Sequence, residues 1–323
     1  MNSPRIVTLT VNPALDMAAQ AAEVRPVHKI RTFGEHYDPG GGGINVARVI
    51  HELGGNTLAL FAAGGVTGRF VEEMLSQAGV PFSCIPMRGP TRISLTVRDQ
   101  ASGLEYRFVP YGPRLDAAEC TSILDALATI EADWLVASGS LPPGVPTDFY
   151  ASVAQIAARR GVKFALDTSG SALKASLGHG IDVLKPSLNE FETIVGRESS
   201  EPSSRAMQAV DLVRSGIARM IALTLGSDGV ILATADGALP LPAMPVKERT
   251  GVGAGDSFLA GLVLGLARGQ PRDQALRLAI AAGAAAVAGS GTARVQRADV
   301  EALYRGFRAG TPELPVGAPI SGT

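Results

Sequence analysis

Short apolar runs alternate with segments of helical periodicity along most of the 323-residue chain. The runs typical of strands are residues 6–10, 57–61, 134–137, 162–166, 183–185 and 220–225. Between them, apolar residues recur at helical spacing in 44–53, 69–77, 148–159 and 205–214. Strands that alternate with helices predict βαβ units, in which a mostly parallel sheet carries helices on both faces. We therefore expect a three-layer α/β/α core, with ligands at the carboxyl ends of its strands.

Two stretches, 18–38 and 91–109, are predicted to form strands without intervening helices. In the second stretch, apolar and polar residues alternate with the period of a half-buried antiparallel strand. The apolar positions are Ile93, Leu95 and Val97. A turn at 101–103 then predicts a hairpin. These segments indicate a small sheet that closes over a site or pairs between subunits, and the alternative is an edge of the main sheet.

Composition narrows the class of protein. Charged residues make up 18% and hydrophobic residues 46%, which is typical of globular chains. The formal net charge of −1 and the lack of a Lys/Arg block argue against a nucleic-acid partner. No apolar run is long enough to span a bilayer, and Cys84 and Cys120 lie far apart without metal-binding spacing. We expect core thiols in a cytoplasmic protein, with a domain over 1–310 and a disordered tail over 311–323.

Residues 251–257, Gly-Val-Gly-Ala-Gly-Asp-Ser, lead into an apolar helical run over 258–267. Backbone N–H groups at a helix start have no intrahelical partners, so they can bind an anion. Glycines let a phosphate approach that backbone, and Asp256 could take a proton from an attacking hydroxyl. This segment predicts a phosphotransferase. The alternative is an ordinary helix start that Asp256 caps.

A second glycine cluster occupies 40–43, before an amphipathic helix. Four consecutive glycines cost conformational entropy, and a plain turn needs only one or two. We favour close approach of a ligand to this backbone over a flexible loop. Asn45 would then point its amide at the same ligand.

Further candidates lie outside the glycine clusters. Asp16 follows the first strand, where a carboxylate could accept a hydrogen bond from a sugar hydroxyl. Four cations in the segments of the small sheet suit a phosphorylated substrate, although each alone could be a surface charge. They are Lys29, Arg31, Arg92 and Arg107. The rigid segment 138–144 and the hairpin turn 225–229 are also candidates, the latter for packing against a nucleotide.

Several motifs are missing from the sequence. The chain has no G-x-x-x-x-G-K-[ST] loop and no protein-kinase catalytic set. It has no G-x-G-x-x-G, no zinc pattern and no G-x-S-x-G elbow. Walker-type, Rossmann, zinc and hydrolase sites therefore lack support.

Together, residues 8–16, 40–45 and 250–257 resemble the PfkB/ribokinase family of sugar kinases, and the similarity extends over about residues 5–308. The resemblance implies a ribokinase-like α/β/α core with a small β-sheet lid, formed by segments of about 12–40 and 88–112. Within the family, the chain is similar to the phosphosugar kinases, and most to the branch of bacterial minor 6-phosphofructokinases. Kinases for fructose 1-phosphate and tagatose 6-phosphate usually carry a lysine where this chain has Gly42.

The resemblance also implies roles for single residues. Asp256 would be the catalytic base, with an anion hole at Gly253, Ala254 and Gly255. The sugar would contact Asp16, Gly40, Gly41, Asn45 and Ser140. Its phosphate would be held by Lys29, Arg92 and Arg107, and Arg31 would reach the site of a neighbouring subunit. ATP would contact Lys185, Ser187, Thr224, Gly226, Gly229, Gly251, Gly253 and Gly255. Mg²⁺ would bind at Glu190, although Ser187 replaces the asparagine of the family's Asn-x-x-Glu motif, and K⁺ would bind near 288–292.

The hypothesis is ATP-dependent phosphorylation of the 1-hydroxyl of fructose 6-phosphate, by a homodimer joined through the lid. Within the family, the alternatives are kinases for tagatose 6-phosphate, fructose 1-phosphate, or an unphosphorylated sugar or nucleoside. From another class, the alternative is a catalytically inactive sugar-phosphate binding or regulatory protein. A reductase has the least support, because the dinucleotide fingerprint is missing.

Overall fold

The computed structural model describes residues 3–196, 201–246, 252–289 and 295–310. Within them, nine strands form one sheet in the order β13-β12-β11-β10-β9-β8-β1-β4-β5. In chain order the strands are β1 (Arg5–Thr10), β4 (Asn56–Ala63), β5 (Phe82–Pro86), β8 (Trp134–Ser138), β9 (Lys163–Asp167), β10 (Val183–Leu184), β11 (Ile221–Thr224), β12 (Val230–Thr234) and β13 (Gly237–Leu241). Neighbours from β5 to β11 pair in parallel, and β12 and β13 are antiparallel. The predicted mostly parallel sheet is confirmed.

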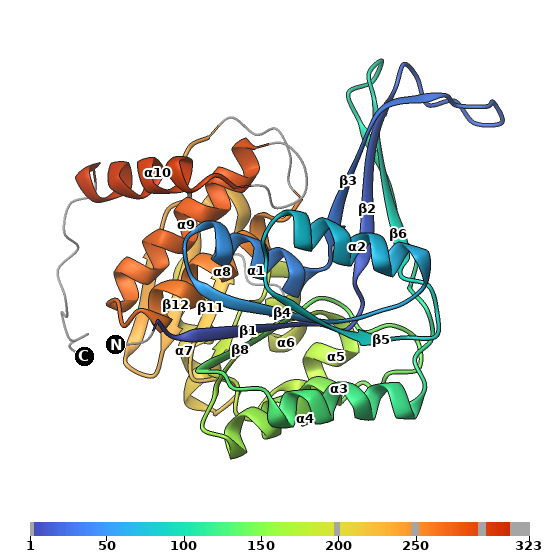
Figure 1. The fold of residues 1–323 in the computed structure, drawn as a ribbon. Coiled ribbons are helices and arrows are strands. Elements are labelled where there is room, and N and C mark those ends of the chain that lie inside the picture. The colour runs from blue at the N-terminus through green and yellow to red at the C-terminus, as the bar shows by residue number, and fades with distance from the viewer. Residues whose placement is uncertain (1–2, 197–200, 247–251, 290–294, 311–323) are drawn as a thin grey trace.

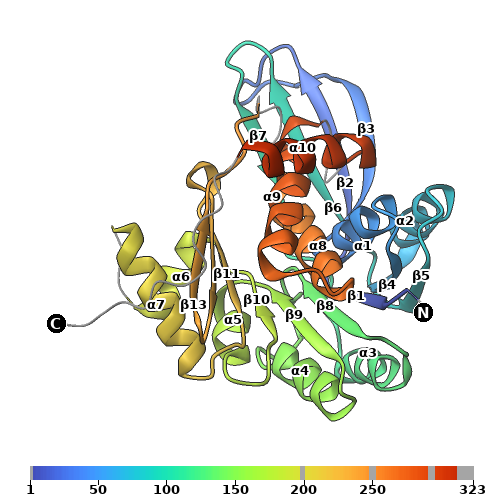
Figure 2. The ribbon, with the colours of Figure 1, turned by 90° about the vertical axis from the view of Figure 1, so that its left-hand side faces the viewer.

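Helices cover both faces of this sheet, which confirms the three-layer core (Figures 1 and 2). One layer holds α3 (Ala117–Thr129), α4 (Phe149–Arg159), α5 (Gly170–Ser176), α6 (Leu188–Val195) and α7 (Pro202–Arg214). The other holds α1 (Gly42–Glu52), α2 (Gly65–Gln77), α8 (Ala254–Ala267), α9 (Arg272–Ala288) and α10 (Arg297–Gly310). Among the described residues, no helix combines the length and the apolar character that crossing a bilayer requires.

The central strands are buried on both sides. In β1, Val7 and Leu9 pack towards the layer of α3 and α4, whereas Ile6 packs towards α1 and α8. Such strands appear in a sequence as short, continuous apolar runs, which is why they were predictable. Trp134 of β8 is also buried, and the Lys163 ammonium lies 5.3 Å from the centre of its ring.

A second, four-stranded sheet projects from the core in the described part of the chain (Figure 1). Its order is β3-β2-β6-β7, with β2 (Ala14–Ala21), β3 (Thr32–Gly40), β6 (Arg92–Asp99) and β7 (Glu105–Phe108). All four strands lie within the predicted lid segments, so the small sheet is confirmed and the alternative of a main-sheet edge is wrong. We call this sheet the lid. The predicted tail, 311–323, lies outside the described residues.

The half-buried pattern of β6 is inverted relative to the expectation. Ile93, from the apolar set, is 43% exposed, although Val97 is buried. The polar set Arg92, Ser94 and Thr96 instead lines a cavity between the lid and the core. The face of β6 that points inward is therefore polar because it surrounds a site rather than a core.

Helices α8 and α9 approach each other through small residues. A Cβ atom at Gly261 would lie 2.9 Å from the Cα atom of Ala279, and one at Gly265 would lie 2.8 Å from the Cα atom of Ala275. Both distances are shorter than real Cβ contacts, so the helix backbones would have to separate. This packing determines where the first turn of α8 lies.

We predict that Gly261→Ala destabilises the protein by roughly 1–2 kcal/mol, because overpacking against Ala279 outweighs the better helix propensity of alanine. The matched control is Gly306→Ala in α10, where an added Cβ meets no atom within 4 Å. That control should raise stability by up to about 1 kcal/mol through propensity alone. Urea unfolding measures both, and a Gly261→Ala variant as stable as the parent would contradict this account.

Candidate active site

The first turn of α8 is the centre of the candidate site. Gly253 is the N-cap residue, with φ 80° and ψ 3°, a left-handed conformation that favours glycine. The first intrahelical bond runs from the Ser257 N–H group to the Gly253 carbonyl at 2.9 Å. The N–H groups of Ala254, Gly255 and Asp256 therefore have no acceptor within the helix. They lie at the positive end of the helix dipole, where an anion is stabilised. Gly251 lies outside the described residues.

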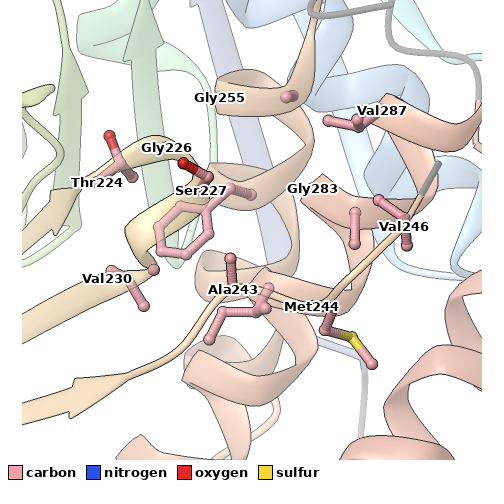
Figure 3. Close-up of a pocket in the computed structure, with 15 residues that line it drawn as sticks. Thr224, Gly226, Ser227, Val230, Ala243, Met244, Val246, Gly255, Gly283 and Val287 are labelled. Atoms are coloured by element: carbon pink, nitrogen blue, oxygen red, sulfur yellow. The ribbon is translucent and has the colours of Figure 1, made fainter. Parts of the chain in front are cut away.

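A cavity of about 380 Å³ lies on one side of this turn and is called the larger cavity here. Figure 3 shows Thr224, Gly226 and Ser227 on one side of it and Val246 and Val287 on the other. Its remaining walls are mostly apolar: Val230, Ala243, Met244, Phe258, Ile280 and Ala284. An apolar slot with a few hydroxyl groups and glycines suits a planar aromatic ligand.

Among the predicted ATP contacts, Thr224, Gly226, Gly229 and Gly255 line the larger cavity. The turn from Gly226 to Asp228 connects the antiparallel strands β11 and β12, so the predicted hairpin is confirmed. Gly229 has φ 104°, and a Cβ atom there would lie 2.2 Å from the Leu241 carbonyl oxygen. The hairpin itself therefore requires this glycine.

A cavity of about 270 Å³ lies on the other side of the turn, under the lid, and is called the smaller cavity. Five residues predicted to bind the sugar or its phosphate line it: Asp16, Gly41, Asn45, Arg92 and Arg107. Asp256 and Gly253 line it as well, so the α8 turn contacts both cavities. Asp38, Ser94 and Thr96 were not predicted, although their alternation with apolar residues on β3 and β6 was visible.

Asp256 is half-buried and hydrogen-bonded on both carboxylate oxygens. The Asn45 amide donates to Oδ2 at 2.9 Å, and the Ser138 hydroxyl donates to Oδ1 at 3.1 Å. Burial, with the nearby charge of Asp167, raises the pKa of Asp256 to about 6, against the opposing effects of Asn45, Lys185 and Ser138. A carboxylate with a pKa near neutrality is suited to accept a proton in a reaction at neutral pH.

Lys185 lies beside the same turn. Its ammonium is 3.1 Å from the Asp167 carboxylate, and only 7% of its side chain is exposed. Burial lowers the pKa of Lys185, but Asp167, Asp256 and Glu190 together outweigh burial, so the net pKa is raised. A Cβ atom on Gly255 would lie 3.4 Å from Nζ. The lysine therefore remains charged against the anion-binding turn.

Asp167 was missed by the sequence analysis, which included Ser138 only as the first residue of the candidate segment 138–144. Ser138 ends β8 and Asp167 ends β9, and the two residues pair in the parallel register of these strands. Polar residues at the carboxyl ends of adjacent parallel strands are a signal for a site, but the order of the strands has to be known first.

Protein atoms account for the four consecutive glycines. Added Cβ atoms at Gly40, Gly42 and Gly43 would lie 2.4 Å or less from Asp16, Ser138 and the Leu9 carbonyl oxygen, respectively. Gly41 has φ 111°, and its Cβ would lie 2.6 Å from Thr10. Close packing of the start of α1 onto β1, β2 and β8 requires these glycines, and of the four only Gly41 also lines the smaller cavity. The prediction that a ligand approaches the backbone at 40–43 therefore explains Gly41 at most, and packing against protein atoms explains the other three glycines.

Arg92 forms hydrogen bonds to two of the connections at the base of the lid. Its guanidinium donates to the Pro110 carbonyl at 2.8 Å and to the Asn12 carbonyl at 3.0 Å. Asn12 follows β1 and Pro110 follows β7, so the two carbonyls belong to segments through which the lid joins the core. Burial lowers the pKa of Arg92, and Asp16 opposes this effect. The guanidinium also faces the smaller cavity.

Four residues that were predicted to contact a substrate do not line the smaller cavity of this chain. Lys29 is exposed in the connection between β2 and β3, as is Arg31, for which a neighbouring subunit was predicted. Ser140 is exposed and accepts a hydrogen bond from Asn12 at 3.3 Å. Gly40 packs against Asp16 instead of lining the cavity. These residues do not join the others within a single chain.

Ser187 and Glu190 form a capping box at the start of α6. The Ser187 N–H group and hydroxyl donate to Glu190 Oε2 at 2.7 and 2.8 Å. This local role explains a serine at a position where the family has asparagine. Within the described residues, no group of three His, Cys, Asp or Glu side chains is arranged to hold a metal ion. Residues 290–292 of the predicted K⁺ loop are outside the described part of the chain.

The chain is similar in sequence to several kinases of sugar phosphates. The ATP-dependent 6-phosphofructokinase isozyme 2 of Mycobacterium tuberculosis (strain H37Rv) is 44% identical over 303 residues, which cover 93% of this chain and 89% of the relative. The Escherichia coli (strain K12) protein of the same name is 36% identical over 302 residues, which cover 93% and 98%. A 1-phosphofructokinase of Rhodobacter capsulatus is 31% identical over 285 residues, which cover 86% and 88%.

Solved structures of E. coli phosphofructokinase-2 share the fold. The complex with potassium has a TM-score of 0.90 at 36% identity, and it covers 94% of this chain and 99% of that one. The complex with fructose-6-phosphate and the tetrameric inhibited form each have a TM-score of 0.89. The family of pfkB carbohydrate kinases matches residues 12–298. This match and the identity to its members show that the chain belongs to the PfkB family of carbohydrate kinases.

Proposed function

We propose that this chain is an ATP-dependent 6-phosphofructokinase, which phosphorylates the 1-hydroxyl of fructose 6-phosphate. The observation that carries the proposal is the α8 turn, which contacts an apolar cavity on one side and a polar cavity with two arginines on the other. ATP would occupy the larger cavity, with its γ-phosphate at the turn. The sugar would occupy the smaller cavity. Relatives with this name at 36% and 44% identity support the choice of substrate.

In the proposed reaction, the Asp256 carboxylate accepts the proton of the 1-hydroxyl while the hydroxyl oxygen attacks the γ-phosphorus in line. The bond between the γ-phosphorus and its bridging oxygen breaks, and ADP leaves. The N–H groups of residues 254–256 and the Lys185 ammonium stabilise charge on the transferred group. Loss of one preorganised donor of this kind typically raises the barrier by about 3–4 kcal/mol.

The other end of the sugar carries the phosphate. Arg92 and Arg107 line the smaller cavity and can form charge-assisted hydrogen bonds to its oxygens. Asp16 lies close enough to Arg92 to affect its pKa, and its carboxylate can accept a hydrogen bond from a sugar hydroxyl. This combination of cations and acceptors favours a phosphorylated sugar over a neutral one.

Glu190 is the residue in this chain that would hold Mg²⁺, because carboxylate oxygens are ligands that this ion prefers and the capping box holds this one in place. When bound, Mg²⁺ neutralises charge on the β- and γ-phosphates. K⁺ near residues 288–292 and a cytoplasmic location remain predictions.

A homodimer through the lid would bring Lys29 and Arg31 to a second active site. Large apolar side chains are exposed on the lid and its connections: Val27, Phe33, Ile93, Leu104, Phe108, Val109 and Tyr111. These exposed apolar side chains support an interface between subunits at the lid. The E. coli relative also has a tetrameric inhibited form, so larger assemblies belong to the same proposal.

The second candidate is 1-phosphofructokinase activity, which the 31% identical relative favours. Gly42 argues against it, because related kinases for such sugars usually have lysine there. A Cβ atom at Gly42 would lie 2.2 Å from Ser138 Oγ, so a lysine would displace a partner of Asp256. The values of kcat/KM for fructose 6-phosphate, fructose 1-phosphate and tagatose 6-phosphate with ATP decide between the two, and the proposal fails if fructose 6-phosphate is not the best substrate.

We predict that Asp256→Asn lowers kcat by about 10²–10⁴-fold, the usual contribution of a general base. Folding should not suffer, since the asparagine keeps both hydrogen-bond partners. Folding raises the pKa of Asp256, so its ionisation costs stability. This cost is absent below the ordinary carboxyl pKa, grows as pH rises, and is complete above a pH of about 6. The difference from an ordinary carboxyl pKa corresponds to at most about 3 kcal/mol. ADP release and thermal melting at pH 8 test both effects, and near-normal turnover would remove Asp256 from the mechanism.

The rate should also depend on pH through Asp256. Below a pH of about 6, kcat should fall towards tenfold per pH unit, because the protonated carboxyl cannot accept a proton. Measurement of kcat at saturating substrate removes the effect of substrate phosphate ionisation on binding. A flat profile from pH 5 to 8 would show that Asp256 does not titrate in the reacting complex.

Arg92→Ala should raise the KM for fructose 6-phosphate by about 10-fold or more, the loss of one charge-assisted hydrogen bond, and leave the KM for ATP unchanged. Arg92→Lys should recover only part of the loss, because an ammonium cannot bridge both carbonyls and a phosphate. Arg98→Ala is the matched control on the same strand, since Arg98 is exposed outside the cavity. A rise in the KM for ATP instead would reverse the assignment of the two cavities.

A further inference from the structure

Arg48, in the second turn of α1, connects the lid to the partner of Asp256. Only 14% of its side chain is exposed. Nη1 donates to the Pro39 carbonyl at 3.2 Å and to Oδ1 of Asn45 at 3.4 Å. Nη2 lies 3.4 Å from Oδ1 of Asp38. One guanidinium therefore contacts both the end of β3 and the Asn45 amide.

The contact with Asn45 determines which end of its amide faces Asp256. An amide has one accepting oxygen and one donating NH₂ group, and an arginine can only donate. While Arg48 occupies the oxygen, the NH₂ group points at Asp256 and donates to Oδ2 at 2.9 Å. A reversed amide would put its oxygen against the carboxylate and its NH₂ group against the guanidinium, and both contacts would be repulsive.

Asp38 connects the same guanidinium to the lid. It is 3% exposed, it lines the smaller cavity, and it pairs in register with Asp16 of β2. A buried carboxylate needs a cation or several donors, and Arg48 lies on one oxygen of Asp38. His36 of β3 approaches the other oxygen, with Nε2 at 3.3 Å from Oδ2. The position of β3 therefore influences where the guanidinium lies.

We propose that Arg48 is a positioning residue that orients the Asn45 amide towards Asp256 and ties it to Asp38 of the lid, which makes ionisation of the base depend on the seating of β3. The kinetic test of this proposal rests on the proposed function, because it measures the phosphorylation of fructose 6-phosphate. The hydrogen bond from Asn45 is one of the interactions that favour the ionised form of Asp256. The other groups that affect the pKa of Asp256 are Asp167, Lys185 and Ser138, and none of them contacts Arg48 in the hydrogen bonds and ion pairs described above. The charged side chains Asp16, Asp38, Arg92 and Arg107 line the same cavity as Asp256.

The first test is the pH profile of kcat in Arg48→Met and Arg48→Lys. The acid limb is the fall of kcat at low pH. In both variants it should move to higher pH by about one unit, because the hydrogen bond from Asn45 to the charged Asp256 carboxylate is weakened. Lysine keeps the charge but cannot reach Asn45, Asp38 and the Pro39 carbonyl together. If Arg48→Lys keeps the parent's limb while Arg48→Met shifts it, the charge alone acts and the positioning role is wrong.

A second test does not depend on activity. Thermal stability is measured from pH 5 to 8 for Asp256→Asn in the parent and in the Arg48→Met background. Because a higher pKa makes the ionised Asp256 more costly in the folded state, the stabilisation by Asp256→Asn should be larger in the Arg48→Met background. In both backgrounds it should begin near the ordinary carboxyl pKa, but the pH at which it stops growing should be higher by about one unit in the Arg48→Met background. Equal curves in both backgrounds would overturn the inference, even if the protein phosphorylates another sugar.

Controls separate the remaining explanations. Arg48→Met removes this cation from Asp38, so the double variant Asp38→Asn/Arg48→Met tests the shift in a protein without the Asp38 charge, and the shift should persist. His36→Gln should leave the position of the limb unchanged, and a limb lost with His36 would assign the titration to that residue and overturn the proposal. Arg159→Met, an exposed arginine on α4 beyond the central sheet, should match the parent.

Discussion

The position of the first α8 turn is the constraint on which both cavities depend. Gly261 and Gly265 let α9 approach α8 closely, which places the helix along its whole length. At its start, the hydrogen bonds from Asn45 and Ser138 join the turn to α1 and to the end of β8. The same few residues then face an apolar cavity with Gly255 and a polar cavity with Asp256. A donor and an acceptor of a phosphoryl group can meet at this turn.

The second constraint is the balance of buried charge around that turn. Lys185 is paired with Asp167, so its positive charge is only partly available to offset Asp256. The remaining carboxylate is stabilised by neutral donors, which offset burial incompletely. A protein selected for stability alone would avoid this arrangement, and such conflicts are typical of functional sites. The hydrogen bond from Asn45 is therefore important for the ionisation of Asp256, and so is the contact of Asn45 with Arg48.

The sequence predicted the layers, the lid and the centre of the site, because hydrophobic period and glycine motifs are local signals. It did not predict Asp167 or the contact of Ser138 with Asp256, since only the order of β8 and β9 in the sheet brings these two residues to Asp256. The inward polar face of β6 was also missed, because alternation alone does not say which side is a core. Protein atoms, not visible in a sequence, require Gly40, Gly42 and Gly43. The sequence also did not show that Lys29 lies outside the smaller cavity, because the position of this residue depends on the path of the β2–β3 connection.

Trp134 has a practical consequence for the study of this protein in solution. It is the one tryptophan in the sequence, and it is buried in β8 beneath the Lys163 ammonium. Its fluorescence therefore reports on the integrity of the central sheet, far from the projecting strands. Emission that stays constant when substrates are added does not argue against closure. A fluorophore introduced on β7 would be needed to test whether the lid closes over the core.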